Sequence, residues 1–166
     1  MEREKPLLGK AMRPQKERRK WMKALSSNVL LIDSGFWFAF FNETGNYHLN
    51  ALAYEDYLKK YQLAIPWPSL YETLNTKLVK NKNSIINFEK VLSQSNVHFI
   101  EDHEFRKDAY NNTLKLSTSG KRPISFVDMI IRSILEDVNF RVNYLLTFNP
   151  GDFYDICLKR KIELIN

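Results

Sequence analysis

Short runs of consecutive apolar residues, separated by longer stretches with helical spacing, organise the chain from residue 29 onward. The runs show no alternation of apolar and polar positions, which is typical of strands that are covered on both faces. Prolines close the second run, where a helix or strand cannot easily continue. We predict strands at Val29–Ile32, Leu63–Trp67, Val97–Ile100, Tyr144–Leu146 and Ile162–Ile165.

Between these runs the apolar residues recur at spacings of three and four, which predicts helices. The expected helices are Gly35–Phe41, Leu49–Tyr61, Ser69–Val79, Ile85–Leu92, Glu104–Leu116, Ile124–Val138 and Phe153–Lys159. Strands that alternate with helices favour a parallel sheet with right-handed crossovers and helices on both faces. The pattern therefore predicts an α/β fold.

Four carboxylates stand where the pattern changes from strand to helix. They are Asp33, Glu72, Asp128 and Asp152. In an open parallel sheet such junctions share one edge, outside the carboxyl ends of the strands, so these side chains are expected to meet. Several like charges at one place cannot all stay ionised without a neutralising partner. Either some are protonated or a divalent cation is bound, and hard oxygen ligands suit Mg²⁺ or Mn²⁺.

Three of these acids also have a purely structural explanation. The spacings from Ser69 to Glu72 and from Ser125 to Asp128 are those of a capping box, in which two side chains satisfy free backbone groups of a first helical turn. Asp152 follows Asn-Pro-Gly, and an acid in the first turn is favoured by the helix dipole.

Asp33 is harder to explain in this way. It ends a fully apolar strand and precedes Ser-Gly and an aromatic run. A charge that emerges from the middle of a sheet loses hydration unless it has a partner. Taken together, the four acids indicate a metal site.

Composition limits the class of protein. At 166 residues with 44% hydrophobic residues, the chain is long enough for one packed domain. The net charge of +6 lies entirely in residues 1–26, which hold nine Lys or Arg and three Glu. We interpret residues 1–27 as a basic N-terminal arm, flexible or partly helical, and residues 28–166 as the folded domain.

The chain has one cysteine, Cys157, which excludes a disulfide framework and a cysteine zinc site; we expect it to be buried on the last helix. The three histidines show no ligand spacing and are expected to serve in packing or at the surface. No apolar stretch is long enough to span a bilayer, and no secretory signal precedes Val29, so a cytoplasmic protein without membrane contact is expected.

The order of these motifs resembles the PIN-domain nucleases, and among them the small VapC-type toxins. The resemblance covers residues 28–166 and leaves only the arm outside. It rests on Val-Leu-Leu-Ile-Asp33-Ser-Gly, Pro-Ser-Leu-Tyr-Glu72-Thr-Leu, Ile-Ser-Phe-Val-Asp128-Met-Ile-Ile, Tyr-Leu-Leu-Thr147-Phe-Asn149-Pro-Gly-Asp152-Phe153 and the closing Ile-Glu-Leu-Ile. It implies a single three-layer domain whose central five-stranded parallel sheet has the order 3-2-1-4-5.

The resemblance also implies an activity: Mg²⁺- or Mn²⁺-dependent hydrolysis of RNA phosphodiester bonds by an endoribonuclease. Asp33, Glu72, Asp128 and Asp152 would be the catalytic metal ligands. The family often carries its fourth acid two residues after the threonine of the fourth strand, where this chain has Asn149, so either Asn149 or Asp152 completes the site. Ser34 and Thr147 would support the ligands as neighbouring hydroxyls.

RNA is the implied substrate, and an antitoxin protein and a homodimer are the implied partners. The folded part is neutral, so RNA affinity must come from the arm and from local cations, which are Lys77, Lys80, Lys82, Lys121, Arg122 and Arg132. Arg132 lies one turn after Asp128 and would compete with a metal if it paired with that acid.

Two other functions remain open on the sequence. One is a catalytically inactive PIN-like module that binds RNA or protein. The other is a phosphatase of the haloacid-dehalogenase type, which also begins with an aspartate at a strand end. That family requires Asp-x-Asp, and this chain has glycine at position 35. The sequence therefore favours the ribonuclease.

Overall fold

We describe the protein from a computed structural model, which defines residues 28–75 and 77–166. The predicted basic arm at residues 1–27 lies outside the described residues.

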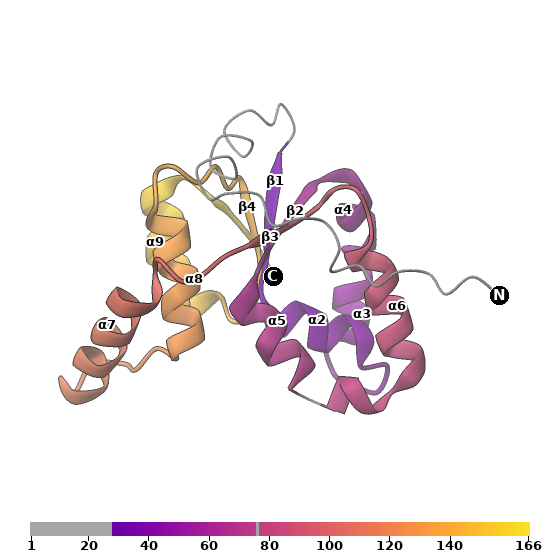
Figure 1. Cartoon of the computed structure of the whole chain (residues 1–166), viewed down its shortest axis with the longest axis horizontal. Helices are drawn as coiled ribbons and strands as arrows, with labels where there is room; N and C mark the ends of the chain where they lie inside the picture. Colours follow the sequence, from indigo (N-terminus) through magenta and orange to yellow (C-terminus); the bar gives the residue numbers. More distant parts are fainter. Residues whose placement is uncertain (1–27, 76) are drawn as a thin grey trace.

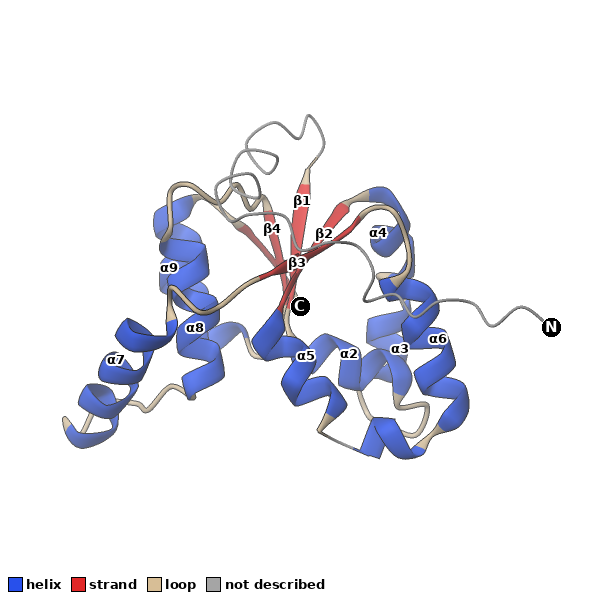
Figure 2. Ribbon diagram, viewed as in Figure 1, coloured by secondary structure: helices blue, strands red, loops and turns tan. Residues whose placement is uncertain are grey.

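A single parallel sheet forms the centre of the fold (Figures 1 and 2). Its strands follow the order β3-β2-β1-β4-β5, which confirms the predicted order 3-2-1-4-5. The strands are β1 (Val29–Ile32), β2 (Gln62–Pro66), β3 (Val97–Ile100), β4 (Tyr144–Leu146) and β5 (Glu163–Ile165). Each lies within one residue of the bounds expected from its apolar run.

The central strand β1 shows why these runs contain no polar positions. Its four residues are all buried, because both faces of the sheet are covered. Val29 and Leu31 pack into one hydrophobic cluster, whereas Leu30 and Ile32 pack into the other. Successive side chains of a strand point to opposite faces, so a strand between two layers of helices must be apolar throughout. The three-layer α/β prediction is thereby confirmed.

Different helices cover the two faces of the sheet. Figure 1 shows α2, α3, α4 and α6 on one side of the sheet and α8 and α9 on the other, with α7 packed on α8. Helix α5 begins directly after β2 and contacts both α2 and α8. The helices are α2 (Ser34–Phe41), α3 (His48–Leu52), α4 (Glu55–Lys60), α5 (Trp67–Leu74), α6 (Lys82–Leu92), α7 (Arg106–Thr118), α8 (Phe126–Glu136) and α9 (Tyr154–Arg160).

Two predicted helices are wrong in extent. The expected helix at Leu49–Tyr61 is divided into α3 and α4, and Tyr54 between them directs its hydroxyl to the carbonyl oxygen of Asn166, 2.8 Å away. The expected helix at Ser69–Val79 ends at Leu74 and is followed by a short 3-10 turn, η2 (Lys77–Lys80), which buries Leu78. At each of these places a residue makes a tertiary contact, Tyr54 with Asn166 and Leu78 with a buried hydrophobic cluster.

Cys157 lies buried on α9, as predicted, and burial raises the pKa of its thiol to about 11. Among the described residues, no helix is both long and apolar enough to cross a membrane.

Candidate functional site

The candidate site lies at the carboxyl ends of three adjacent strands, β2, β1 and β4. Asp33 directly follows β1, and Glu72 lies on α5, which begins where β2 ends. Asp152 closes η3 (Pro150–Asp152), shortly after β4. Asp128 lies in the first turn of α8, which follows α7, so the prediction that it stands at a strand-to-helix junction is wrong. It still reaches this edge because α8 leads into β4, and a crossover helix begins at the carboxyl edge of a parallel sheet.

Asp33 is buried and held by donors on both carboxylate oxygens. It caps α2, and its Oδ1 accepts a hydrogen bond from the backbone N–H of Ser34 at 2.7 Å. Its Oδ2 accepts from the hydroxyl of Thr147 at 2.9 Å. Burial raises the pKa of Asp33, the bonds from Thr147 and Ser34 oppose that rise, and the charge of Glu72 adds to it. The carboxylate is therefore fixed in position and poorly compensated in charge.

Glu72 is joined to Asp33 through one hydroxyl. Ser34 donates to Oε2 of Glu72 at 2.6 Å, while its backbone N–H binds Asp33. Burial raises the pKa of Glu72, the bond from Ser34 lowers it, and the charge of Asp128 raises it again. The two acids thus share Ser34 as a bridge.

The predicted capping box of Ser69 and Glu72 is wrong. Helix α5 begins at Trp67 with Pro66 at the N-cap, so Ser69 lies inside the first turn, fully buried, and does not cap the helix. Proline is compatible with this position because the first helical residues need no internal N–H partner. Glu72 is consequently free to turn its carboxylate toward Ser34.

Asp128 is half-buried and is bound by Ser125, the residue that caps α8. The Ser125 hydroxyl accepts from the Asp128 backbone N–H at 3.0 Å and donates to Oδ2 of Asp128 at 2.7 Å, as the predicted capping-box spacing suggested. Burial raises the pKa of Asp128 to about 6; the bond from Ser125 opposes this, and the charges of Asp33 and Asp152 reinforce it. This acid therefore changes protonation just below neutral pH.

The mutual effects on pKa show that the four acids belong to one electrostatic site. Glu72 acts on Asp33, Asp128 acts on Glu72, and both Asp33 and Asp152 act on Asp128. Charges influence one another in this way only over short distances or through a low-dielectric interior.

The fourth acid has a different environment. Asp152 is buried, and its Oδ1 lies 2.6 Å from Nη2 of Arg122 in an ion pair. Its Oδ2 accepts a hydrogen bond from the side-chain amide of Asn149. The backbone N–H of Asn149 in turn donates to the Thr147 hydroxyl at 3.0 Å, so Thr147 links this half of the site to Asp33.

Sequence reasoning missed the Arg122–Asp152 pair. It named Arg122 only as one of several cations for RNA, because 30 positions separate it from its partner along the chain. The expected competition of Arg132 for Asp128 is wrong: Arg132 binds both carboxylate oxygens of Asp155, at 2.6 and 2.7 Å, and the backbone carbonyl of Asp152. Asp128 therefore has no arginine partner on its own helix.

His48 and His98 make polar contacts with neighbouring groups, whereas His103 is exposed. A ring nitrogen of His48 lies 3.0 Å from the carbonyl oxygen of Ala39, and one of His98 lies 2.7 Å from the side-chain oxygen of Gln62. His48 lies on α3 and His98 on β3, and neither contact involves one of the four acids.

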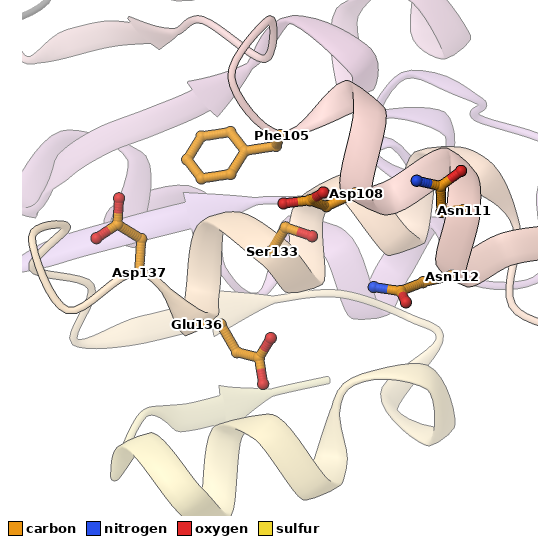
Figure 3. A pocket seen from close by; sticks show the side chains of 7 residues that line it. All are labelled: Phe105, Asp108, Asn111, Asn112, Ser133, Glu136 and Asp137. Atoms are coloured by element: carbon orange, nitrogen blue, oxygen red, sulfur yellow. The ribbon is translucent and has the colours of Figure 1, made fainter.

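A separate pocket lies between α7 and α8 (Figure 3). It is lined by Phe105, Asp108, Asn111, Asn112, Ser133, Glu136 and Asp137. Two of its three acids are engaged, Glu136 with Lys159 and Asp137 with Asn139. None of the four site acids lines this pocket, so it is distinct from the candidate site.

The donor set at the sheet edge fits a hard divalent cation in chemistry and in charge. It consists of carboxylate oxygens, the ligands that Mg²⁺ and Mn²⁺ prefer. Three of these carboxylates have raised pKa values, which a nearby cation would lower. Within residues 28–75 and 77–166, no three His, Cys, Asp or Glu side chains are grouped closely enough to hold a metal ion as they stand.

Comparison with known proteins identifies the fold. No protein-family model and no curated protein matches the sequence. Among solved structures, VapC20 of Mycobacterium tuberculosis, a toxin that cleaves the sarcin-ricin loop, superposes with a TM-score of 0.59 over 76% of this chain and 94% of its own. The fold is that of the VapC-type PIN domain. The sequence identity to VapC20 is 15%, so the similarity concerns architecture.

Two further structures share this VapC-type fold. VapBC2 of Rickettsia felis, solved bound to a DNA fragment from its promoter, matches with a TM-score of 0.53 and 20% identity over 83% of this chain and 98% of that one. FitAcB of Neisseria gonorrhoeae matches with a TM-score of 0.53 and 17% identity, over 82% of this chain and 96% of that one. The fold expected from the PIN-domain resemblance is thereby confirmed.

Proposed function

We propose that this protein is a metal-dependent endoribonuclease that hydrolyses RNA phosphodiester bonds and acts as the toxin of a toxin–antitoxin pair. One observation carries the proposal: Asp33, Glu72 and Asp128 form an electrostatically coupled cluster at the carboxyl edge of a VapC-type sheet. VapC20, which has this fold, is a toxin that cleaves the sarcin-ricin loop.

Asp33, Glu72 and Asp128 would hold Mg²⁺ or Mn²⁺. The bound ion would supply Lewis acidity toward the phosphate and lower the pKa of a water nucleophile. Ser34 and Thr147 orient Glu72 and Asp33. The described acids would still have to move closer together to share one ion.

An antitoxin partner and a homodimer belong to the same proposal. The Rickettsia felis relative is a VapBC2 assembly on promoter DNA, which supports a protein partner for a chain with this fold. Co-expression of the protein with the product of a short neighbouring gene, followed by size-exclusion chromatography, would test both assemblies.

A catalytically inactive PIN-like module that binds RNA or protein is the second candidate. The engagement of Asp152 by Arg122 and Asn149 favours it, because the fourth acid is then not available as a simple metal ligand. The two functions differ in one result, which is cleavage.

The deciding experiment incubates the purified protein with end-labelled single-stranded RNA in Mg²⁺, in Mn²⁺ and in EDTA. We expect cleavage in either metal and none in EDTA. Glu72→Gln should lose the activity, whereas Glu89→Gln, an exposed glutamate on α6 outside the site, should keep it. RNA binding without cleavage in every metal would select the inactive module, and equal cleavage in EDTA would refute metal dependence.

A further inference from the structure

The fourth acid of the site, Asp152, pairs with an arginine, Arg122, for which the metal site gives no role. Arg122 lies in the loop between α7 and α8, three residues before Ser125, the N-cap of α8. Its Nη2 lies 2.6 Å from Oδ1 of Asp152. The side chain of Arg122 is 63% exposed, whereas that of Asp152 is 9% exposed. A buried carboxylate thus holds an arginine that faces solvent.

Gly151 makes room for this arrangement. A Cβ at position 151 would lie 2.7 Å from Nη1 of Arg122, closer than such atoms approach, so a larger residue would push the guanidinium away. Asn149 binds the other oxygen of Asp152 and fixes the carboxylate from the opposite side. The η3 turn therefore leaves space for one guanidinium beside Asp152.

Most of the guanidinium remains available to a ligand. An arginine carries five N–H donors in a planar fork. The contact between Arg122 and Asp152 is an ion pair at 2.6 Å without an aligned hydrogen bond, so it leaves these donors available. By contrast, Arg132, the other arginine beside η3, is occupied by Asp155 and by the carbonyl of Asp152. Of these two arginines, Arg122 is the one with donors to spare.

The position places a cation beside an acidic centre that must accept a polyanion. Asp152 lies near enough to Asp128 for its charge to act on that residue. A guanidinium fork matches two oxygens of a phosphate, and it stays charged at all accessible pH values. Without a bound metal ion, a phosphodiester that approaches the three other acids would otherwise be repelled by them.

We infer that Arg122 binds a phosphate of the RNA backbone and that Asp152, supported by Asn149, positions this arginine. In this arrangement Asp152 orients Arg122 toward the substrate and does not bind the metal. The metal ligands are then Asp33, Glu72 and Asp128. This inference rests on the proposed function for its substrate, but it concerns binding and can be measured without cleavage.

The test measures the affinity of full-length protein for labelled single-stranded RNA in EDTA at several salt concentrations. Arg122→Ala should weaken binding by about tenfold to a hundredfold, the range for a charge-assisted contact. It should also reduce the slope of log K against log salt by about 0.7, the value for one phosphate contact to a single strand. Arg122→Lys should restore the slope and part of the affinity, because it keeps the charge and loses the fork.

The molecule provides a matched control. Arg106 is 51% exposed and binds the buried Asp102 through two hydrogen bonds, outside the candidate site. Arg106→Ala removes the same charge from a similar pair. It should change the affinity by less than about twofold and the slope of log K against log salt by much less than about 0.7. Equal losses in the two alanine variants would overturn the inference, because they would report net charge alone.

Asp152→Asn tests the positioning role. If Asp152 holds Arg122, this variant should weaken RNA binding and should add little further loss to Arg122→Ala in a double-mutant cycle. If Asp152 acts only as a repelling charge, its neutralisation should strengthen RNA binding, which would overturn the role. Circular dichroism of each variant checks that the fold is retained.

Cleavage assays on the same proteins separate this inference from the proposed function. Wild-type cleavage together with unchanged RNA affinity in Arg122→Ala would refute the phosphate contact and leave the nuclease intact. Loss of affinity in Arg122→Ala without any wild-type cleavage would keep the phosphate contact and refute the nuclease. A wild-type protein that does not bind RNA would overturn both.

Discussion

The two halves of the candidate site stabilise their buried carboxylates in different ways. In the half formed by β1 and α5, Asp33 and Glu72 are stabilised only by neutral donors, chiefly the Ser34 and Thr147 hydroxyls. In the half formed by η3 and the loop before α8, Asp152 has its own cation, Arg122. Hydroxyls fix a carboxylate without cancelling its charge, so the first half keeps the negative charge that suits a metal ion. A guanidinium cancels the charge of the carboxylate, and its remaining N–H donors suit the second half to an anion.

Asp128 stands between the two halves, and its loss should have the largest effect. Asp128→Asn should reduce metal-dependent cleavage of RNA by more than about a hundredfold, since a metal contributes several kcal/mol of transition-state stabilisation. The amide still accepts from the Ser125 hydroxyl, and the cap of α8 is kept. Initial rates with labelled RNA measure the loss.

The same variant should melt at an equal or higher temperature in metal-free buffer, because one of several repelling charges is removed. A large decrease in melting temperature would mean that Asp128 matters only as a capping residue. An unchanged cleavage rate would remove Asp128 from the site.

Ser34→Ala should affect the metal-binding half alone. Glu72 would lose its hydroxyl donor and the bridge to Asp33, and we expect about tenfold to a hundredfold weaker Mn²⁺ binding by calorimetry, as for other groups that orient metal ligands. Ser84→Ala provides the control, because Ser84 is also buried but donates to the Phe41 carbonyl away from the site. Equal Mn²⁺ affinity in the two variants would contradict the bridging role.

Thr147→Val should destabilise the protein by about 1–3 kcal/mol, the cost of leaving a buried polar group without its partner. The valine can neither donate to Asp33 nor accept from the backbone N–H of Asn149. Urea unfolding measures the change. Thr73→Val is the matched control, since Thr73 is equally buried and its hydroxyl donates to the helical carbonyl of Ser69. A smaller loss for Thr147→Val than for Thr73→Val would show that Thr147 does not join the halves.

The smallest effect concerns pH. Because the pKa values of Asp33, Glu72 and Asp128 are raised, the folded protein binds protons more tightly than the unfolded chain, and stability decreases as pH rises through about 6, the pKa of Asp128. We expect the metal-free protein to melt about 2–4 °C lower at pH 7.5 than at pH 5, equivalent to about 1 kcal/mol for a chain of this size. Asp155, whose pKa is lowered, acts only below its ordinary value of 3.8 and does not affect this window.

Adding Mn²⁺ should remove most of this difference, because a bound cation favours the ionised acids. Asp128→Asn should flatten the profile without metal. Melting temperatures that rise with pH over this range in EDTA would contradict the idea that the first half lacks a compensating cation.

Sequence patterns predicted the sheet well because a strand between two helical layers needs an uninterrupted apolar run. The bounds of β1, β3 and β4 agree with those runs, and the buried Cys157 follows from the same reasoning. The division into α3 and α4 could not be predicted in this way, since local spacing carries no information about tertiary contacts such as that of Tyr54, at the break, with the last residue described.

Sequence patterns predicted the sheet and its two helical layers, because both depend on local periodicity. They also singled out four acids whose role in a metal site stays a prediction. What each acid contacts depends on the tertiary structure. Ser34 reaches Glu72 across 38 positions, and Thr147 reaches Asp33 across 114. Arg122 reaches Asp152 across 30 positions, and its guanidinium lies beside Gly151. Hydrogen bonds and ion pairs of this kind depend on distances of a few ångströms between segments that are remote along the chain, and residue spacing carries no information about them.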